Sequence, residues 1–116
     1  PEIWSTLPDP VDTINAISDA QPVEAMLGKP IDLVNLVVHN ATVATDDGET
    51  IEVRRTVLVD KRGAAFAAVS EGLIASLRLV LGTINRQPPF DPPLKISVTQ
   101  KNTRRGRRVY KVNVLK

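Results

Sequence analysis

The chain has 116 residues, of which 42% are hydrophobic and 24% charged, and it contains no cysteine and a single histidine, His39. This length supports one domain with one core, and the composition is that of a soluble globular protein. Disulfides, cysteine metal sites and thiol nucleophiles are excluded, and histidine-based metal sites and catalytic triads are hard to build. No apolar run reaches the roughly 20 residues of a membrane helix and no signal-peptide pattern opens the chain, so we expect a cytoplasmic protein.

The formal net charge of +2 hides a strong asymmetry between the two halves of the chain. Residues 1–60 hold three basic and eleven acidic residues, a net charge of −8, whereas residues 61–116 hold twelve basic and two acidic residues, a net charge of +10. This distribution predicts a polyanionic partner for the C-terminal half, attraction between the halves, or both in turn.

Residues 1–29 are interpreted as an acidic N-terminal arm. Asp9-Pro10 and Gln21-Pro22 each precede a short apolar-periodic run, and Gly28 closes the second run. Because Asp is a favoured N-cap and Pro a favoured first helical residue, we expect one or two short helical turns in this arm.

Three strands are expected next, over residues 31–44, 49–59 and 64–69. The first is too rich in β-branched residues to form a good helix. Turn signals at residues 46–48 and 60–63 separate the strands, and the second strand alternates apolar and polar side chains. The pattern predicts a meander in which the second strand is covered on one side and exposed to water on the other.

The hydrophobic period changes from two to about 3.6 at Ser70, which predicts a helix with Ser70 as its N-cap and an end between residues 82 and 86. Four of the nine prolines then fall within residues 88–93 and form a stiff connector. Alternation over residues 94–99 and 109–114 predicts a closing hairpin, whose turn is KNTRRGRR at residues 101–108.

This order of elements is that of an OB-fold, a mainly β architecture in which one helix lies between the third and fourth strands of a five-stranded barrel. We therefore divide the chain into the arm, residues 1–29, and an OB-fold nucleic-acid-binding domain, residues 30–116. In an OB-fold, oligonucleotides lie across strands two and three, between the loop joining strands one and two and the loop joining strands four and five.

Basic residues converge on this groove under the predicted topology. Six of the eleven residues from 101 to 111 are basic and occupy the closing hairpin, and others lie on or just after the second strand. Phosphate neutralisation releases counterions and arginine stacks on bases, so the sequence predicts a nucleic-acid-binding surface. Its candidate residues are Arg54, Arg55, Lys61, Arg62, Phe66, Lys101, Arg104, Arg105, Arg107, Arg108 and Lys111.

Several of these residues also have purely structural interpretations. A charged turn such as the hairpin is commonly just solvated surface. Arg54 and Arg55 point to opposite faces of their strand, so at most one faces the groove while the other is free to pair with Glu49 or Glu52. Phe66 is either a core residue or a ring left accessible by its small alanine neighbours.

Aromatic residues are scarce, and only four occur, namely Trp4, Phe66, Phe90 and Tyr110. Base stacking contributes about 1–3 kcal/mol per base, so high affinity would need arginine stacking or cooperative assembly. Tyr110 shares the face of Val112 and Val114 and is interpreted as core. Phe90 is expected to pack under the proline loop, and Trp4 to anchor the arm or an oligomer contact.

The sequence contains no convincing catalytic or metal-binding constellation. Asp46, Asp47 and Glu49 share a turn, but acidic turns seldom bind a divalent cation. Ser70 already has a capping role, and His39 is better explained as a strand residue hydrogen-bonded to a neighbour. We therefore expect neither an enzyme nor a bound metal or cofactor.

Three segments carry a resemblance to a known family: LVVHNATVATDDGET, RRTVLVDKRGAAFAAVSEGLIASLRLVLGTI and KISVTQKNTRRGRRVYKVNV. Over residues 30–115 the chain resembles the small single-stranded-DNA-binding proteins of bacteriophages and other mobile elements. The features that carry the resemblance are His39 late in a long first strand, the pattern D-x-x-G-x-x-F-x-x-x-S-x-G from Asp60 to Gly72, and the basic hairpin. The resemblance implies an OB-fold protein that coats single-stranded DNA in replication or recombination. The family pattern has more aromatic residues early in the third strand, where this chain has Ala64 and Ala65.

We therefore expect a non-catalytic, sequence-tolerant single-stranded-DNA-binding protein. Because one small barrel covers few nucleotides, we also expect a homo-oligomer or cooperative assembly on DNA. The arm is predicted to compete with DNA for the basic groove or to dock on a neighbouring protomer. Two alternatives stay open, an RNA-binding accessory barrel and a protein-docking module of a phage particle that uses the hairpin against an acidic protein.

Overall fold

The structure, a computed structural model, describes residues 3–102, 104, 106 and 108–115. Its elements in chain order are β1 (Ile3–Ser5), α1 (Pro10–Asp19), β2 (Gln21–Pro22), the 3₁₀ helix η1 (Val23–Met26), β3 (Ile31–Ala44), β4 (Thr50–Asp60), β5 (Ala65–Val69), α2 (Glu71–Ile84), β6 (Leu94–Asn102) and β7 (Arg108–Val114). Within this part of the chain, neither α-helix has the length and apolarity needed to cross a membrane.

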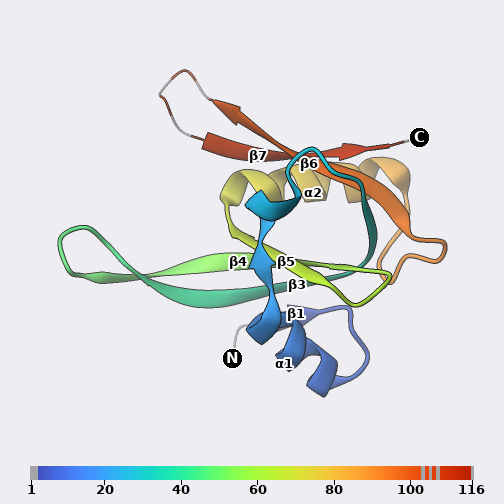
Figure 1. The fold of residues 1–116 in the computed structure, drawn as a ribbon, viewed down its shortest axis with the longest axis horizontal. Coiled ribbons are helices and arrows are strands. Elements are labelled where there is room, and N and C mark those ends of the chain that lie inside the picture. The colour runs from blue at the N-terminus through green and yellow to red at the C-terminus, as the bar shows by residue number, and fades with distance from the viewer. Residues whose placement is uncertain (1–2, 103, 105, 107, 116) are drawn as a thin grey trace.

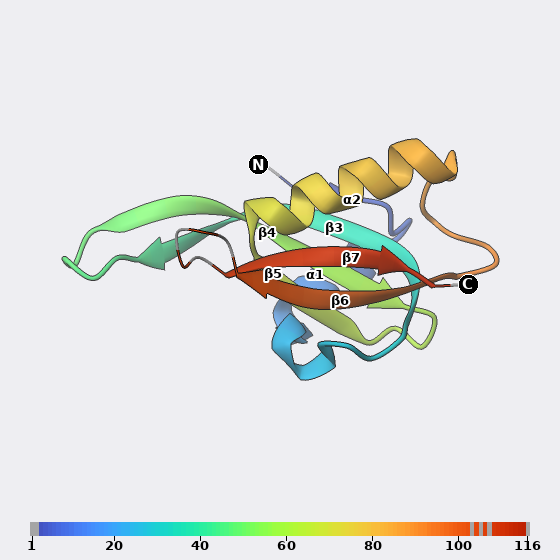
Figure 2. The same ribbon diagram turned by 90° about the horizontal axis from the view of Figure 1, so that it is seen from above.

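The strands form one curled, mixed sheet with the order β2-β5-β4-β3-β6-β7, and β1 pairs with β3 beside this path (Figure 1). β3 pairs with β4 along most of its length, while on its other edge it pairs first with β6, over residues 31–33, and then with β1, over residues 37–39. This change of neighbour lets the β6–β7 hairpin curl away from β3 and β4, with α2 beside β7 (Figure 2). The result is an OB-fold-like half-barrel.

The two faces of the sheet are covered by different helices because successive strand residues point to opposite sides. Leu36, Leu58 and Phe66 face inward and pack with Leu73 and Leu77 of α2 in the main core. Full burial of such a side chain contributes about 1.5–3 kcal/mol, so this layer holds the half-barrel together.

A smaller apolar cluster fixes α1 to the outer face of the sheet. Val37, Val57 and Ala67, which alternate with the inward-facing residues, pack with Ala16 of α1 in this cluster. The acidic arm is therefore part of the folded sheet rather than a separate tail.

The expected helix caps are confirmed. The Asp9 carboxylate accepts a hydrogen bond from the Val11 amide at 2.9 Å, and the Ser70 hydroxyl oxygen accepts one from the Leu73 amide at 3.1 Å. Both contacts satisfy amide groups that a first helical turn leaves without a partner. The second helix ends at Ile84, within the predicted interval.

The mainly β, OB-fold-like architecture is confirmed, but the prediction of five strands and a single barrel helix after the third strand is wrong in detail. The described residues form seven strands, and α2 follows the fifth of them in chain order. The two extra strands, β1 and β2, come from the arm and are only three and two residues long. Strands so short are defined by their partners in β3 and β5, which no local pattern reveals.

The arm also spans the open side of the half-barrel. Gln21 and Pro22 pair in parallel with β5, and Leu27 forms a bridge to Val98 of β6. In Figure 1 this segment runs between the β3–β5 layer and the β6–β7 hairpin. The division of the chain at residue 29 stays a prediction, although Val23 of the arm belongs to the main core.

Candidate nucleic-acid interface

The β6–β7 hairpin displays lysines on one outer face. Lys101 lies opposite Val109 and Lys111 lies opposite Thr99 in the antiparallel register. Opposed residues share a face and alternate residues along a strand do too, so both lysines project from the same side of the hairpin. Arg104 in the turn is exposed as well. Arg105 and Arg107 lie outside the described residues, and Arg108 is described only as the first residue of β7.

Tyr110 lies on the opposite face of the hairpin and packs against the main core, as expected for this residue. Its hydroxyl group donates a hydrogen bond to the carboxylate of Glu24 in the arm. This hydrogen bond is the main reason why the pKa of Glu24 lies below its ordinary value. The contact joins η1 to the hairpin across the open side of the half-barrel.

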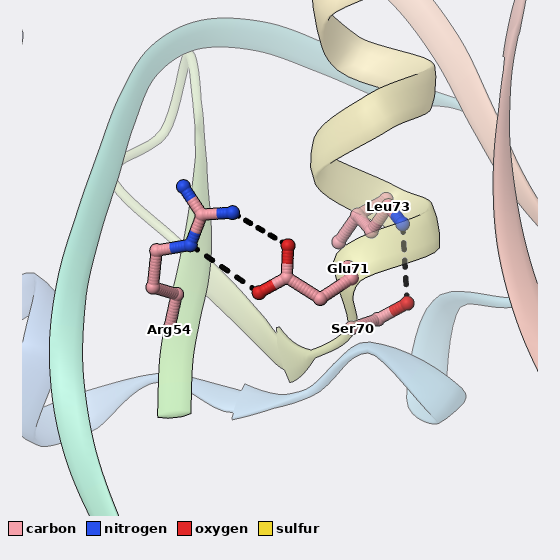
Figure 3. A network of polar contacts seen from close by, with 4 residues as sticks. All are labelled: Arg54, Ser70, Glu71 and Leu73. Carbon is pink, nitrogen blue, oxygen red and sulfur yellow. Dashed lines mark hydrogen bonds and ion pairs between the residues drawn. The ribbon is translucent and has the colours of Figure 1, made fainter. Parts of the chain in front are cut away.

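Arg54 and Arg55 point to opposite faces of β4, as predicted, but neither pairs with the acids that the sequence suggested. Arg54 faces the α2 side and forms an ion pair with Glu71, with 2.5 Å between Nη2 and Oε2 and 3.3 Å between Nε and Oε1 (Figure 3). The bonds to Arg54 lower the pKa of Glu71 and raise the pKa of the guanidinium. The side chain of Arg54 is 41% exposed and that of Glu71 is 70% exposed, so a phosphate group can reach Arg54 from solvent.

Arg55 faces the α1 side and has a structural role. Its Nη1 atom donates to the backbone oxygen of Ile17 in α1 at 3.0 Å and lies 3.2 Å from Nε2 of His39. Because arginine only donates, Nε2 of His39 accepts, and Nδ1 donates to the backbone oxygen of Asn40 at 3.0 Å. Arg55 therefore ties the arm to the sheet, and His39 is hydrogen-bonded to its strand neighbours as the sequence favoured.

Lys61 and Arg62 lie at the far end of the molecule from the hairpin tip. Leu33 pairs with both Asp60 and Leu94, so the β4–β5 turn sits beside the start of β6. The hairpin tip is eight residues further along β6, roughly 26 Å away at 3.3 Å per residue. The two ends are separated in both ribbon views (Figures 1 and 2). The sequence had suggested that Lys61 and Arg62 share one groove with the hairpin residues. The structure instead places them apart.

Phe66 does not supply an accessible ring in this structure. Its side chain is 7% exposed and packs inside the main core. Phe90 is buried too, against the same core, and the guanidinium of Arg86 stacks 5.3 Å from its ring centre. Trp4 is 52% exposed and is the most accessible aromatic side chain among the described residues.

The outer face of β4 and β5, where an OB-fold binds its oligonucleotide, is covered by α1 over part of its area. Two hollows remain open, one of about 360 Å³ between the arm and the edge of β5, and one of about 780 Å³ between α1, the β4–β5 turn and the proline loop. The smaller hollow is lined by residues of the sheet and hairpin on one side and of the arm on the other, namely Arg55, Val69, Tyr110, Ala20, Pro22 and Glu24. The groove expected from the sequence is thus narrowed by the protein's own arm.

The structure therefore gathers fewer cations than the sequence suggested. Lys101, Arg104 and Lys111 lie on the hairpin. Arg54 lies near the start of β7, because it pairs with Glu71 and the adjacent Gly72 lies against Val109. Sequence reasoning missed both acidic partners of this region, Glu71 and Glu24. Glu24 and Tyr110 are 86 positions apart, so no local pattern could have linked them.

A family model described as phage single-stranded DNA-binding protein matches residues 10–114 of the chain. The match spans the half-barrel and most of the arm, from the first residue of α1 onward. No match is found among curated proteins or among solved structures. The resemblance inferred from the sequence over residues 30–115 is thus confirmed, and it extends further towards the N-terminus.

Proposed function

We propose that this chain coats single-stranded DNA during replication or recombination, from the premise that it belongs to the phage single-stranded DNA-binding protein family. Single-stranded DNA is the ligand that the family gives. The family match carries the proposal, and the exposed lysines and arginine of the β6–β7 hairpin support it because each phosphate that they neutralise releases counterions. We further propose a purely binding role, without catalysis, in the cytoplasm of the host cell.

The proposed path of the strand follows the hairpin and the hollow at the edge of β5. The phosphates contact Lys101, Arg104 and Lys111, together with the hairpin arginines 105, 107 and 108. Arg54 contributes from beside the start of β7 when a phosphate displaces Glu71. Lys61 and Arg62 are left out of this path, since they lie at the other end of the half-barrel, and Phe66 is left out because it is buried.

We propose that the chain assembles on DNA as a homo-oligomer or by cooperative binding. One small half-barrel with few accessible rings covers few nucleotides, so neighbouring protomers are needed for high affinity. Analytical ultracentrifugation of the free chain and of its complexes with oligomers of increasing length tests this part. A single protomer on every length of oligomer, bound without cooperativity, would contradict it.

The decisive experiment removes the charge of the hairpin. We expect the variant in which Arg104, Arg105, Arg107 and Arg108 are all alanine to bind a labelled dT oligomer at least several-fold more weakly. The slope of log affinity against log salt should fall by up to about three, at about 0.7 per lost phosphate contact. Fluorescence anisotropy at several salt concentrations measures both, with duplex DNA as the control ligand.

Unchanged affinity and slope in this variant would overturn the proposed interface. Tighter binding of an RNA oligomer than of the matched DNA oligomer would instead favour an RNA-binding role. The 2′-hydroxyl group is the only constant difference between the two backbones, so the comparison isolates it.

A further inference from the structure

A second groove lies on the α2 side of the sheet, away from the hollow beside the arm. It has a volume of about 350 Å³ and runs between β1, β3 and α2. Apolar side chains and two arginines line it, among them Trp4, Val38, Leu77, Leu81, Arg54 and Arg78. The only tryptophan of the chain and two cations thus meet in one accessible groove.

The strand register explains why Trp4 and Arg54 face the same side. Trp4 lies opposite Val38, which in turn lies opposite Thr56 of β4, and opposed residues share a face. Arg54 is two residues before Thr56 and therefore projects to that same face. Pairing of β1 with β3 holds the backbone of Trp4 in place while 52% of the residue stays exposed.

The cations of the groove are not fully neutralised by the described acids. Arg78 is exposed, and no described carboxylate forms an ion pair with it. Glu71 pairs with Arg54, and the charge of Arg78 also helps to lower the pKa of Glu71. Two guanidinium groups and one carboxylate leave a net positive charge beside an open indole ring.

We propose that this groove is a nucleotide subsite, in which a base of the single strand stacks on the indole of Trp4 while adjacent phosphates bind Arg78 and Arg54. The inference rests on the proposed function and extends the proposed DNA-binding surface to a second face of the sheet. Stacking on an aromatic ring tolerates any base, because every base has a π-face, and therefore suits a sequence-tolerant protein. Phosphate binding to Arg54 replaces its ion pair with Glu71.

The groove is continuous with the hairpin surface through the start of α2. A Cβ atom at Gly72 would lie 3.2 Å from the Cβ of Val109, so the start of β7 contacts Gly72, the residue after Glu71. A strand that leaves the hairpin thus meets Arg54 first and the Trp4 groove next. A symmetric contact between two copies would bring like-charged arginines together, whereas a phosphate backbone neutralises them, so DNA is the favoured occupant.

The intrinsic fluorescence of the chain tests the inference directly, because Trp4 is its single tryptophan. The full chain is titrated with a dT oligomer while Trp4 emission is recorded, and binding is followed separately by the anisotropy of an end-labelled oligomer. We expect the emission to be quenched with the same midpoint as the anisotropy and the bound form to resist acrylamide quenching. An abasic oligomer of the same length should still bind but should leave the emission nearly unchanged.

The outcomes separate the inference from the proposed function. Binding by anisotropy without any change in Trp4 emission or acrylamide quenching would overturn the subsite and leave the proposed function standing. Absence of binding by anisotropy would overturn the proposed function itself.

Variants provide the second readout. We expect Trp4→Ala to weaken dT binding about tenfold and Trp4→Phe to weaken it much less, since the phenyl ring still stacks. Arg78→Ala should lower the salt slope by about 0.7, whereas the matched control Arg62→Ala should not change it. Circular dichroism verifies that each variant is folded. Wild-type affinity in Trp4→Ala together with a wild-type salt slope in Arg78→Ala would overturn the inference. Loss of self-association in Trp4→Ala with unchanged DNA affinity per protomer would also overturn it.

Discussion

The β6–β7 hairpin and the β4–β5 turn are both basic in the sequence, but the structure surrounds them differently with acids. In the turn, Lys61 forms an ion pair with Asp32 at 3.3 Å. The carboxylate of Asp60 accepts hydrogen bonds from the backbone amides of Arg62 and Ala64. On the hairpin, no described carboxylate forms an ion pair with its lysines or with Arg104, and Glu24 accepts a hydrogen bond from the hydroxyl of Tyr110. A basic run is a candidate site for a polyanion only where the fold leaves its charge uncompensated.

The largest difference should appear when equal charge is removed from the two regions. We expect Lys101→Ala with Lys111→Ala to lower the salt slope for dT binding by about 1.4, because two phosphate contacts are lost. The matched pair Lys61→Ala with Arg62→Ala removes the same charge and should leave the slope unchanged. Anisotropy between 50 and 200 mM salt, on the order of the range over which such contacts weaken, measures both variants. Equal losses in the two pairs would break the comparison.

A smaller effect is expected from the acid that touches the hairpin. Glu24→Gln removes a negative charge from the hollow beside Arg55 and Tyr110, so DNA affinity should rise about twofold to threefold at low salt. The gain should disappear at high salt, because these groups are accessible to counterions. A loss of affinity in this variant would show that the arm assists binding rather than competing with it.

The same contact gives a pH prediction with a definite sign. The pKa of Glu24 is lowered from its ordinary value of 4.5, chiefly by the Tyr110 hydroxyl, so the contact stabilises the folded arm above pH 4.5. This stabilisation is lost as the pH falls through the lower pKa of the folded state. Tyr110→Phe should return the pKa of Glu24 towards 4.5, which an NMR titration of its carboxyl carbon measures. An unchanged pKa in this variant would show that the hydroxyl is not the cause.

The smallest effect is expected at the turn. Asp32→Asn breaks the ion pair with Lys61, whose side chain is about half exposed, so the free energy of unfolding should change by less than about 1 kcal/mol. The freed lysine lies at the far end from the hairpin tip, so dT affinity should stay within twofold. Urea unfolding and anisotropy test the two parts, and a clear gain in affinity would bring the turn into the interface.

Local pattern was sufficient to predict most elements of the half-barrel. The long strand β3 has the predicted bounds, and α2 begins after Ser70 as its cap predicts. β1 and β2 were missed because two or three residues carry no periodicity, and their existence depends on β3 and β5. The course of the arm across the open side of the sheet was not predicted for the same reason.

The candidate site was predictable only where charge is dense along the chain. The hairpin lysines were found because KNTRRGRR and its flanks gather six cations in eleven positions. That Arg54 pairs with Glu71 and Arg55 binds the backbone of Ile17 depends on how β4 faces two different helices. The Trp4 groove has no local signal at all, since its lining comes from β1, β3, β4 and α2.

β3 contacts β4, β6 and β1 along a single run of fourteen residues. It connects the start of the hairpin to the tryptophan, so one continuous backbone sets the spacing between the pairing sites of β6 and β1. Inserting a residue between Leu33 and Val37 would change that spacing and reverse the side to which every later side chain points. In the proposed function, β3 thus fixes the separation between the first residues of the hairpin and the Trp4 groove.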